Sequence, residues 1–226
     1  MKKQKQNVMI KGRIIPKRRV SSLDVDPEKG FSELCPEELP VPGALEIVPE
    51  LEKQAEYAHV RALSKDAHPA KSDWAATEER PQLTPILAEA DMDLRWNIHC
   101  VPGTPGFELL PGLRQENYQF IAYKGIEPNR HPYGACYRDL ADTESTGLIE
   151  FLLVNGIGVV IVGGLATSWC LKTTVLQLCR DGRFAVYVNL AACRDIPGSP
   201  TVASIEEMRV AGAIILESSS EISWAD

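Results

Sequence analysis

The clearest candidate for chemistry is Cys170, in the stretch VVIVGGLATSWCLKTTVLQLC at residues 159–179. The pattern predicts a buried strand, a turn at Gly163 and Gly164 that brings the backbone close to a substrate, and a helix that begins near Cys170. The first turn of a helix favours a thiolate, because the macrodipole is positive there and backbone N–H groups are unpaired. Those N–H groups could also stabilise an oxyanion. The alternative is that Cys170 is a small buried apolar residue, as many cysteines are.

Two charged residues end other expected strands. Lys124 follows FIAY, and Asp24 lies in SLDVD. Beside a thiol, an ammonium group lowers the thiol pKa, and a carboxylate can take the thiol proton and pass it to a leaving amine. Alone, Lys124 would be a solvated residue and Asp24 a turn former. Together with Cys170 they provide a nucleophile, an acid/base and an electrostatic stabiliser.

A second set of residues has the chemistry of a metal site. KDAHP supplies Asp66 and His68, two positions apart, so that both can point to one side of an extended chain, and RWNIHC supplies His99. One carboxylate and two imidazoles suit zinc, iron or manganese. A lone Asp-x-His pattern is more often coincidence. The remaining histidines, His59 and His131, have no such partner and are interpreted as structural or surface residues.

The elements that must position these residues alternate between strand and helix. Helices between apolar strands require parallel crossovers, which predicts a mainly parallel, doubly wound sheet in a three-layer α/β/α fold. In such sheets the ligand binds beyond the carboxyl ends of the strands. Strands are expected at 19–25, 59–66, 120–125, 159–164, 184–191 and 213–218, and helices at 42–58, 145–156, 167–182 and 201–212.

Length and charge set the domain organisation. The chain has 226 residues, 44% of them hydrophobic, and a net charge of -7. We expect a basic arm at 1–19, then one domain at 20–226 that contains a long loop at 69–95. The arm is expected to aid solubility and to pair a short strand, VMIKGRII, with the body; a nucleic-acid-binding tail is the alternative.

Composition also excludes some classes of protein. The acidic body argues against nucleic-acid and membrane partners, and charge and proline interrupt the only apolar run near the N-terminus, so we expect a cytoplasmic protein. The six cysteines include no Cys-x-x-Cys pair, which favours reduced thiols over disulfides or a four-cysteine zinc site.

The order of the motifs resembles the nicotinamidase/pyrazinamidase family of the isochorismatase-like cysteine hydrolases. The motifs are DVD…GF, LPVPGA, KDAHP, WNIHCVPGTPG, YKG, PYGACY and IVGGLATSWCLKTT, within a match from about Leu23 to Ile214. The resemblance implies the isochorismatase-like hydrolase fold. It also implies that Asp24, Lys124 and Cys170 are catalytic and that Asp66, His68 and His99 bind a divalent metal, with zinc as the first choice.

The resemblance further implies the substrate pocket. A cis peptide between Leu165 and Ala166 would direct the N–H groups of Ala166 and Cys170 into an oxyanion hole. The residues implied to bind substrate are Phe31, Trp96, Tyr133 and Leu165.

Three features depart from the family pattern. DVDPEKGF replaces the usual Asp-Val-Gln-Asn-Asp-Phe, AKSDW replaces a segment that often holds another histidine, and Ser168 stands where an aspartate is common. The first departure leaves the pocket floor near Asp24 open, and the second leaves open a fourth protein ligand to the metal.

The implied function is hydrolysis of nicotinamide to nicotinic acid and ammonia through a cysteine thioester, a step of NAD salvage. One alternative is a related hydrolase of another small amide or carbamoyl compound; a vinyl-ether-cleaving isochorismatase is less favoured, since that branch does not need the cysteine. A non-catalytic binding or thiol redox-sensor module on the same fold is the other. An exposed helix face is compatible with a homo-oligomer.

Overall fold

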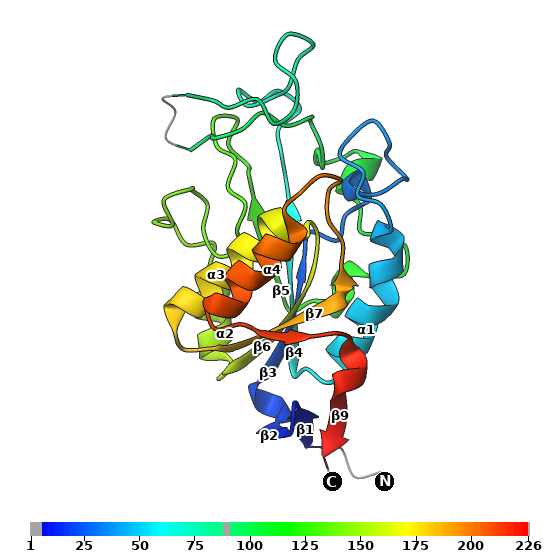
Figure 1. Cartoon of the computed structure of the whole chain (residues 1–226), viewed down its shortest axis with the longest axis vertical. Coiled ribbons are helices and arrows are strands. Elements are labelled where there is room, and N and C mark those ends of the chain that lie inside the picture. The colour runs from blue at the N-terminus through cyan, green and yellow to red at the C-terminus, as the bar shows by residue number, and fades with distance from the viewer. Residues whose placement is uncertain (1–5, 88–90, 226) are drawn as a thin grey trace.

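The computed structural model describes residues 6–87 and 91–225, and its centre is a six-stranded sheet (Figure 1). The strand order is β5-β4-β3-β6-β7-β8, and all neighbouring pairs are parallel. The order reverses direction between β3 and β6, which confirms the doubly wound sheet. The strands are β3 (Val20–Val25), β4 (Val60–Asp66), β5 (Phe120–Lys124), β6 (Val159–Gly164), β7 (Ala185–Cys193) and β8 (Ile214–Leu216).

Helices cover both faces of this sheet, so the three-layer architecture is confirmed (Figure 1). One face carries α1 (Val48–Glu56), and the other carries α2 (Leu148–Val154), α3 (Lys172–Asp181) and α4 (Thr201–Val210). Each helix is shorter than the sequence suggests. The helix expected at 42–58 starts only at Val48, because residues 44–47 form a 3-10 turn in front of it.

The long loop expected at 69–95 lies beyond the carboxyl ends of the strands (Figure 1). It includes residues 88–90, which are outside the described residues. Two isolated bridges, Ala75 with Trp96 and Pro85 with Leu94, fold the loop back on itself. Trp74 is fully buried. The loop therefore carries side chains of the core to the edge of the sheet where a ligand is expected.

The two ends of the chain form a separate three-stranded sheet at the opposite end of the molecule (Figure 1). It pairs β1 (Asn7–Ile10) with β2 (Arg13–Pro16) and with β9 (Ile222–Ala225), all antiparallel. The expected pairing of the N-terminal segment with the body is confirmed, but VMIKGRII forms a hairpin of two strands rather than one strand, and its partner β9 was not among the expected strands. Within residues 6–87 and 91–225, no helix has the length and apolarity needed to cross a membrane.

Candidate active site

Cys170 lies in an irregular turn, Thr167–Leu171, that joins β6 to α3. Trp169, with φ -119° and ψ -105°, breaks the helical geometry, and α3 begins only at Lys172. Cys170 therefore lies in the first turn of the expected helix, but this turn is π-helical and distorted at Trp169, so it lacks regular α-helical geometry. Burial raises the pKa of the Cys170 thiol well above its usual value, and the nearby lysine only partly opposes this. The thiol consequently needs a base before it can attack a substrate.

Gly163 and Gly164, which precede this turn, allow neighbouring strands to pack closely against β6. Gly164 has φ 136°, and a Cβ there would lie 2.0 Å from the carbonyl oxygen of Val25 on β3. A Cβ on Gly163 would lie 2.7 Å from that of Ala192 on β7. We expected these glycines to bring the backbone close to a substrate, but their neighbours are strands of the sheet. The peptide between Leu165 and Ala166 is cis, as expected.

Lys124 connects the thiol to two buried carboxylates. Its Nζ is 3.5 Å from Cys170 Sγ and 3.0 Å from Asp26 Oδ2, and it also donates to Asp66 Oδ1. Oxygen atoms of Asp26 and Asp66 and the sulfur of Cys170 all lie within 4.8 Å of one another. Burial raises the pKa of Asp26 to about 6, although Lys124 opposes the shift. A thiol, an ammonium group and a weakly acidic carboxyl group thus meet at one edge of the sheet.

Asp24 is absent from this group, so the prediction that it lies beside Cys170 is wrong. Its carboxylate accepts hydrogen bonds from Arg61 Nε at 3.0 Å and from the Tyr118 hydroxyl at 2.8 Å. The reason is that β3 continues to Val25, so Asp24 lies inside the strand and not at the edge of the sheet where Cys170 lies. Asp26 follows the strand with φ 46° and reaches the edge instead.

The length of the motif points to Asp26 already in the sequence. DPEKGF, residues 26–31, has the same six-residue length as the Asp-Val-Gln-Asn-Asp-Phe motif, whereas a count from Asp24 requires an insertion. The count from Asp26 also aligns Phe31 with the final phenylalanine. Phe31 is buried and lines the cavity described below, as expected.

Two histidines, His68 and His99, are oriented by backbone carbonyl groups. His68 Nδ1 lies 3.1 Å from the Gly125 carbonyl oxygen, and His99 Nδ1 lies 2.6 Å from that of Asn97. These contacts leave Nε2 of each ring facing Asp66, at 3.4 and 3.5 Å. Gly125 is required here, since its φ is 65° and a Cβ would lie 2.3 Å from the His68 ring. Carbonyl contacts of this kind fix histidine ligands in many metal sites.

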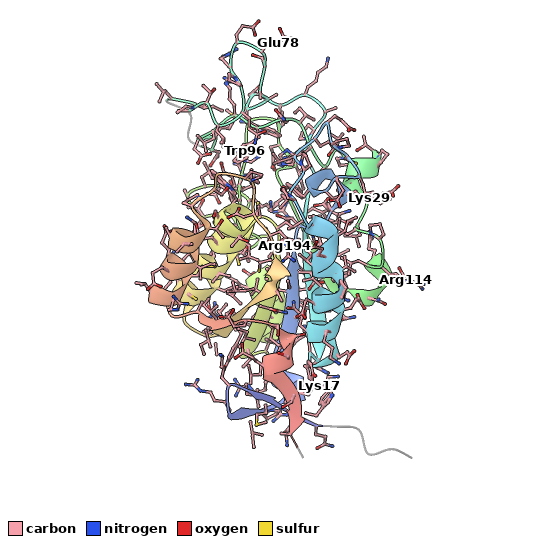
Figure 2. All side chains as sticks on the ribbon, turned by 45° about the vertical axis from the view of Figure 1, so that its right-hand side comes forward. Lys17, Lys29, Glu78, Trp96, Arg114 and Arg194 are labelled. Carbon is pink, nitrogen blue, oxygen red and sulfur yellow. The ribbon has the colours of Figure 1, made fainter. Side chains whose placement is uncertain are left out.

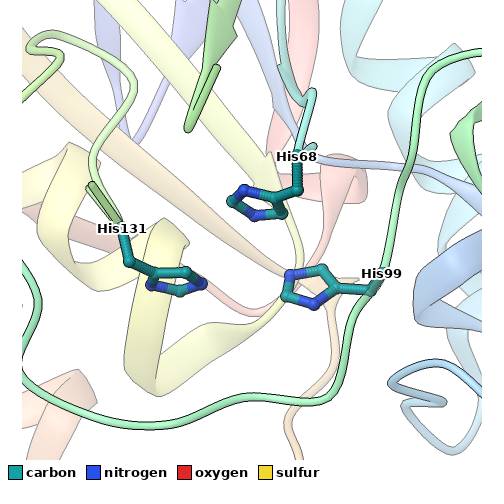
Figure 3. A group of neighbouring side chains, drawn as sticks. All are labelled: His68, His99 and His131. Atoms are coloured by element: carbon teal, nitrogen blue, oxygen red, sulfur yellow. The ribbon is translucent and has the colours of Figure 1, made fainter. Parts of the chain in front are cut away.

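His131 completes the group of three imidazoles (Figure 3). Nitrogen atoms of His68, His99 and His131 lie within 4.8 Å of one another, and all three rings are buried. Neither nitrogen of His131 has a hydrogen-bond partner among the described residues. Burial lowers the pKa of His131 well below its usual value, which keeps the ring neutral. The interpretation of His131 as a structural or surface residue, made because no local pattern links it to the other ligands, is therefore wrong; His59 is exposed.

These residues fit a divalent metal ion. Neutral imidazoles with free nitrogen atoms and an ionised carboxylate are the ligands that zinc, iron and manganese prefer. Burial opposes ionisation of Asp66, but Lys124 and His68 hold its pKa well below the usual value. His68 Nε2 and both nitrogens of His131 are buried and lack hydrogen bonds within the described chain, which is costly unless another group binds there.

A small cavity, partly open to solvent, adjoins both groups and holds about 280 Å³ of space that no protein atom fills. Its walls are mostly aromatic, and Trp96 Nε1 donates to the Tyr133 hydroxyl at 3.1 Å. Trp96 lies toward the end of the molecule that carries the long loop, far from Lys17 (Figure 2). The lining residues are Phe31, Leu39, Asp66, Trp96, His99, His131, Tyr133, Ala166, Trp169, Cys170 and Ile196.

The cavity contains most of the expected pocket residues. Trp96 and Tyr133 line it as expected, but Leu165 packs into the hydrophobic core, and its neighbour Ala166 forms the wall. Three further lining residues, Leu39, Trp169 and Ile196, were not among the expected pocket residues. Trp169 stood beside the expected nucleophile and could have been noticed, whereas Ile196 reaches the cavity only through the fold.

Comparisons with known proteins agree with this geometry. The isochorismatase domain family matches residues 42–220. The chain is 33% identical to a nicotinamidase/pyrazinamidase of Mycobacterium tuberculosis over 172 residues, which is 75% of this chain and 82% of that protein. It is 32% identical to a nicotinamidase of Escherichia coli over 155 residues, 67% of this chain and 72% of that one.

Solved structures give the same result. A nicotinamidase/pyrazinamidase of Acinetobacter baumannii superposes with a TM-score of 0.82 at 26% identity, covering 90% of this chain and 98% of that one. A pyrazinamidase of Pyrococcus horikoshii in complex with zinc gives a TM-score of 0.67 at 26% identity, covering 88% and 98%. The chain belongs to the nicotinamidase/pyrazinamidase branch of the isochorismatase family.

Proposed function

We propose that this protein hydrolyses nicotinamide to nicotinic acid and ammonia through a thioester on Cys170, as a step of NAD salvage. One observation carries the proposal: Cys170 contacts Lys124, which is paired with Asp26, at the wall of a small aromatic cavity. A planar, single-ring amide suits such a cavity, because aromatic walls can clamp the ring while the amide carbon faces the sulfur.

The first half of the reaction forms the thioester. Asp26 accepts the proton of the Cys170 thiol, and the Lys124 ammonium group stabilises the sulfur as it becomes negative. The sulfur then attacks the amide carbon, and the N–H groups of Ala166 and Cys170 bind the oxyanion. Asp26 suits this role because burial raises its pKa to about 6, so it can hold and return a proton near neutral pH.

The second half releases the products. Asp26 gives its proton to the departing nitrogen, which leaves as ammonia, and the C–N bond breaks. A water molecule, deprotonated by Asp26, then attacks the thioester carbon, and the C–S bond breaks to give nicotinic acid. The proton returns to the sulfur, so the thiol and the Asp26 carboxylate are regenerated.

Asp66, His68, His99 and His131 are the residues that would hold a divalent metal, and we propose zinc. A bound metal ion would supply a Lewis-acid anchor for the ring nitrogen of the substrate. Phe31 and Trp96 lie against the histidine rings, with centroid distances of 5.2 Å to His99 and 5.9 Å to His131. They would therefore orient a ring held at that position.

The geometry favours this reaction over a thiol sensor on the same fold. A redox-sensing cysteine is solvent-accessible and has a lowered pKa, whereas Cys170 is buried and burial raises its pKa. We keep hydrolysis of another small amide as the second candidate, since the same three residues would serve it.

The test is ammonia release from nicotinamide by the purified protein, before and after removal of metal with a chelator and after zinc is restored. We expect release that falls on chelation and returns with zinc. Cys170→Ala should lower the rate by at least about 10³-fold, because the nucleophile is lost. Cys179→Ala, on α3 away from the cavity, is the matched control and should keep full activity. Absence of release under every metal condition would contradict nicotinamide as the substrate.

A further inference from the structure

The segment that follows β7 binds three consecutive residues of the turn that carries Cys170. The Arg194 carbonyl oxygen accepts hydrogen bonds from the backbone and the hydroxyl of Thr167, both at 2.9 Å. Trp169 Nε1 donates to the Ser199 hydroxyl at 3.0 Å. Trp169 interrupts the helical geometry of the turn. The turn therefore depends on hydrogen bonds from the segment after β7 to keep its shape.

Asp195 makes the strongest of these contacts. Its Oδ1 accepts a hydrogen bond from the Ser168 backbone N–H at 3.2 Å, and its Oδ2 accepts one from the Ser168 hydroxyl. The carboxylate is itself fixed by the Ile196 N–H at 2.9 Å and by the Thr201 hydroxyl at 2.7 Å. Hydrogen bonds to a charged carboxylate are shorter and stronger than those between neutral groups.

Ser168 lies midway between Ala166 and Cys170, the residues whose N–H groups would bind the oxyanion. A carboxylate that holds the Ser168 N–H fixes the Thr167–Ser168 peptide plane in the middle of the turn, and it thereby restricts how far the planes that carry those two N–H groups can rotate. Asp195 does not line the cavity, so it acts on the substrate only through the turn.

We infer that Asp195 is a positioning residue that holds the Cys170 turn in the shape needed to stabilise the oxyanion. The inference rests on the proposed function and deepens it. It predicts that loss of the Asp195 carboxylate impairs formation of the tetrahedral adduct while binding of the flat product is preserved.

The experiment compares Asp195→Ala with the unchanged protein in three measurements. For nicotinamide hydrolysis we expect kcat to fall about 10- to 100-fold with little change in KM, as for a misplaced oxyanion donor. Affinity for pyridine-3-carbaldehyde, which forms a tetrahedral adduct when the thiol adds across its C=O bond, should fall by a similar factor. Affinity for nicotinate, which forms no adduct, should stay within about twofold, because the pocket itself is intact.

Two further variants separate positioning from a general loss of structure. Asp195→Asn keeps an oxygen that can accept a bond from Ser168 and should recover much of the lost kcat. Thr201→Val removes another partner of the same carboxylate and should change kcat less than about twofold. Equal losses of affinity for the aldehyde and for nicotinate, or no loss of either, would overturn the inference.

The inference can also be tested without the proposed reaction. Alkylation of Cys170 by iodoacetamide, followed by mass spectrometry, needs no amide hydrolysis and should change several-fold in Asp195→Ala, because the turn that holds the buried thiol is no longer fixed. If the unchanged protein releases no ammonia from nicotinamide, the proposed function fails, and an unchanged alkylation rate would then overturn the role of Asp195 separately.

Discussion

Two buried groups of charged residues lie close together in the sheet, one around Asp24 and one around Asp26. In the first, the Asp24 carboxylate accepts bonds from Arg61, Tyr118 and Gln54. In the second, Asp26 Oδ2 has no hydrogen-bond partner among the described residues and depends on its ionic contact with Lys124. The first group is packed away from the cavity, and the second adjoins it.

The difference shows how a structural charge can be told from a functional one. A buried carboxylate whose partners are all in place stabilises one conformation and has no capacity left for a ligand. Unsatisfied buried atoms are costly, so a group of them around one cavity indicates that a substrate or metal supplies the missing partners. Burial raises the pKa of both aspartates, so the pKa alone would not distinguish them.

The largest expected effect comes from replacing each of the two aspartates with asparagine in turn. Asp26→Asn should lower kcat about 10²- to 10⁴-fold, because the acid/base is lost, with little change in the melting temperature. Asp24→Asn should lower the free energy of unfolding by about 3 kcal/mol, because the buried Arg61 then keeps only the exposed Glu52 as a charge partner, and should leave kcat of the folded protein nearly unchanged. Ammonia release and thermal unfolding of both variants measure this. If Asp24→Asn impaired kcat as strongly as Asp26→Asn, the distinction between the groups would fail.

An intermediate effect is expected at the histidines. His131→Gln should lower the affinity for zinc by at least about tenfold, because one of four ligands is lost. The measurement is zinc bound per protein after dialysis against a weak chelator, by elemental analysis, with circular dichroism to verify folding. His59→Gln changes an exposed histidine and is the control. Equal zinc content in the two variants would remove His131 from the ligand set.

The smallest effect concerns single hydroxyl groups. Tyr118→Phe removes one bond to the Asp24 carboxylate and should cost about 1.5 kcal/mol of unfolding free energy, as expected for a hydrogen bond to a charged group. The Tyr187 hydroxyl is buried with no hydrogen-bond partner within the described chain, so Tyr187→Phe should be neutral or slightly stabilising. Urea denaturation of both variants tests the comparison. A larger loss in Tyr187→Phe than in Tyr118→Phe would contradict it.

Much of the fold could be predicted from local patterns. The strand expected at 159–164 has those bounds in the structure, and the strands expected at 59–66 and 120–125 differ from the observed ones by one residue at one end. Apolar β-branched runs between turn residues specify a buried strand locally. Helix starts were less accurate, because turns such as Ala44–Ile47 have helix-like sequences but a different backbone geometry.

The sequence by itself determined the nucleophile candidate Cys170, its partner Lys124 and the Asp-x-His pair of Asp66 and His68, since each lies where an expected strand or the turn after it ends. Tertiary structure showed that Asp26 rather than the expected Asp24 adjoins Cys170, brought His131 to the other histidines, and placed Asp195 against the Cys170 turn. The physical reason is the separation along the chain between the residues that interact. Strand ends follow from neighbouring residues, whereas His131 reaches His68, and Asp195 reaches Ser168, only because parallel strands bring distant loops to the same edge of the sheet.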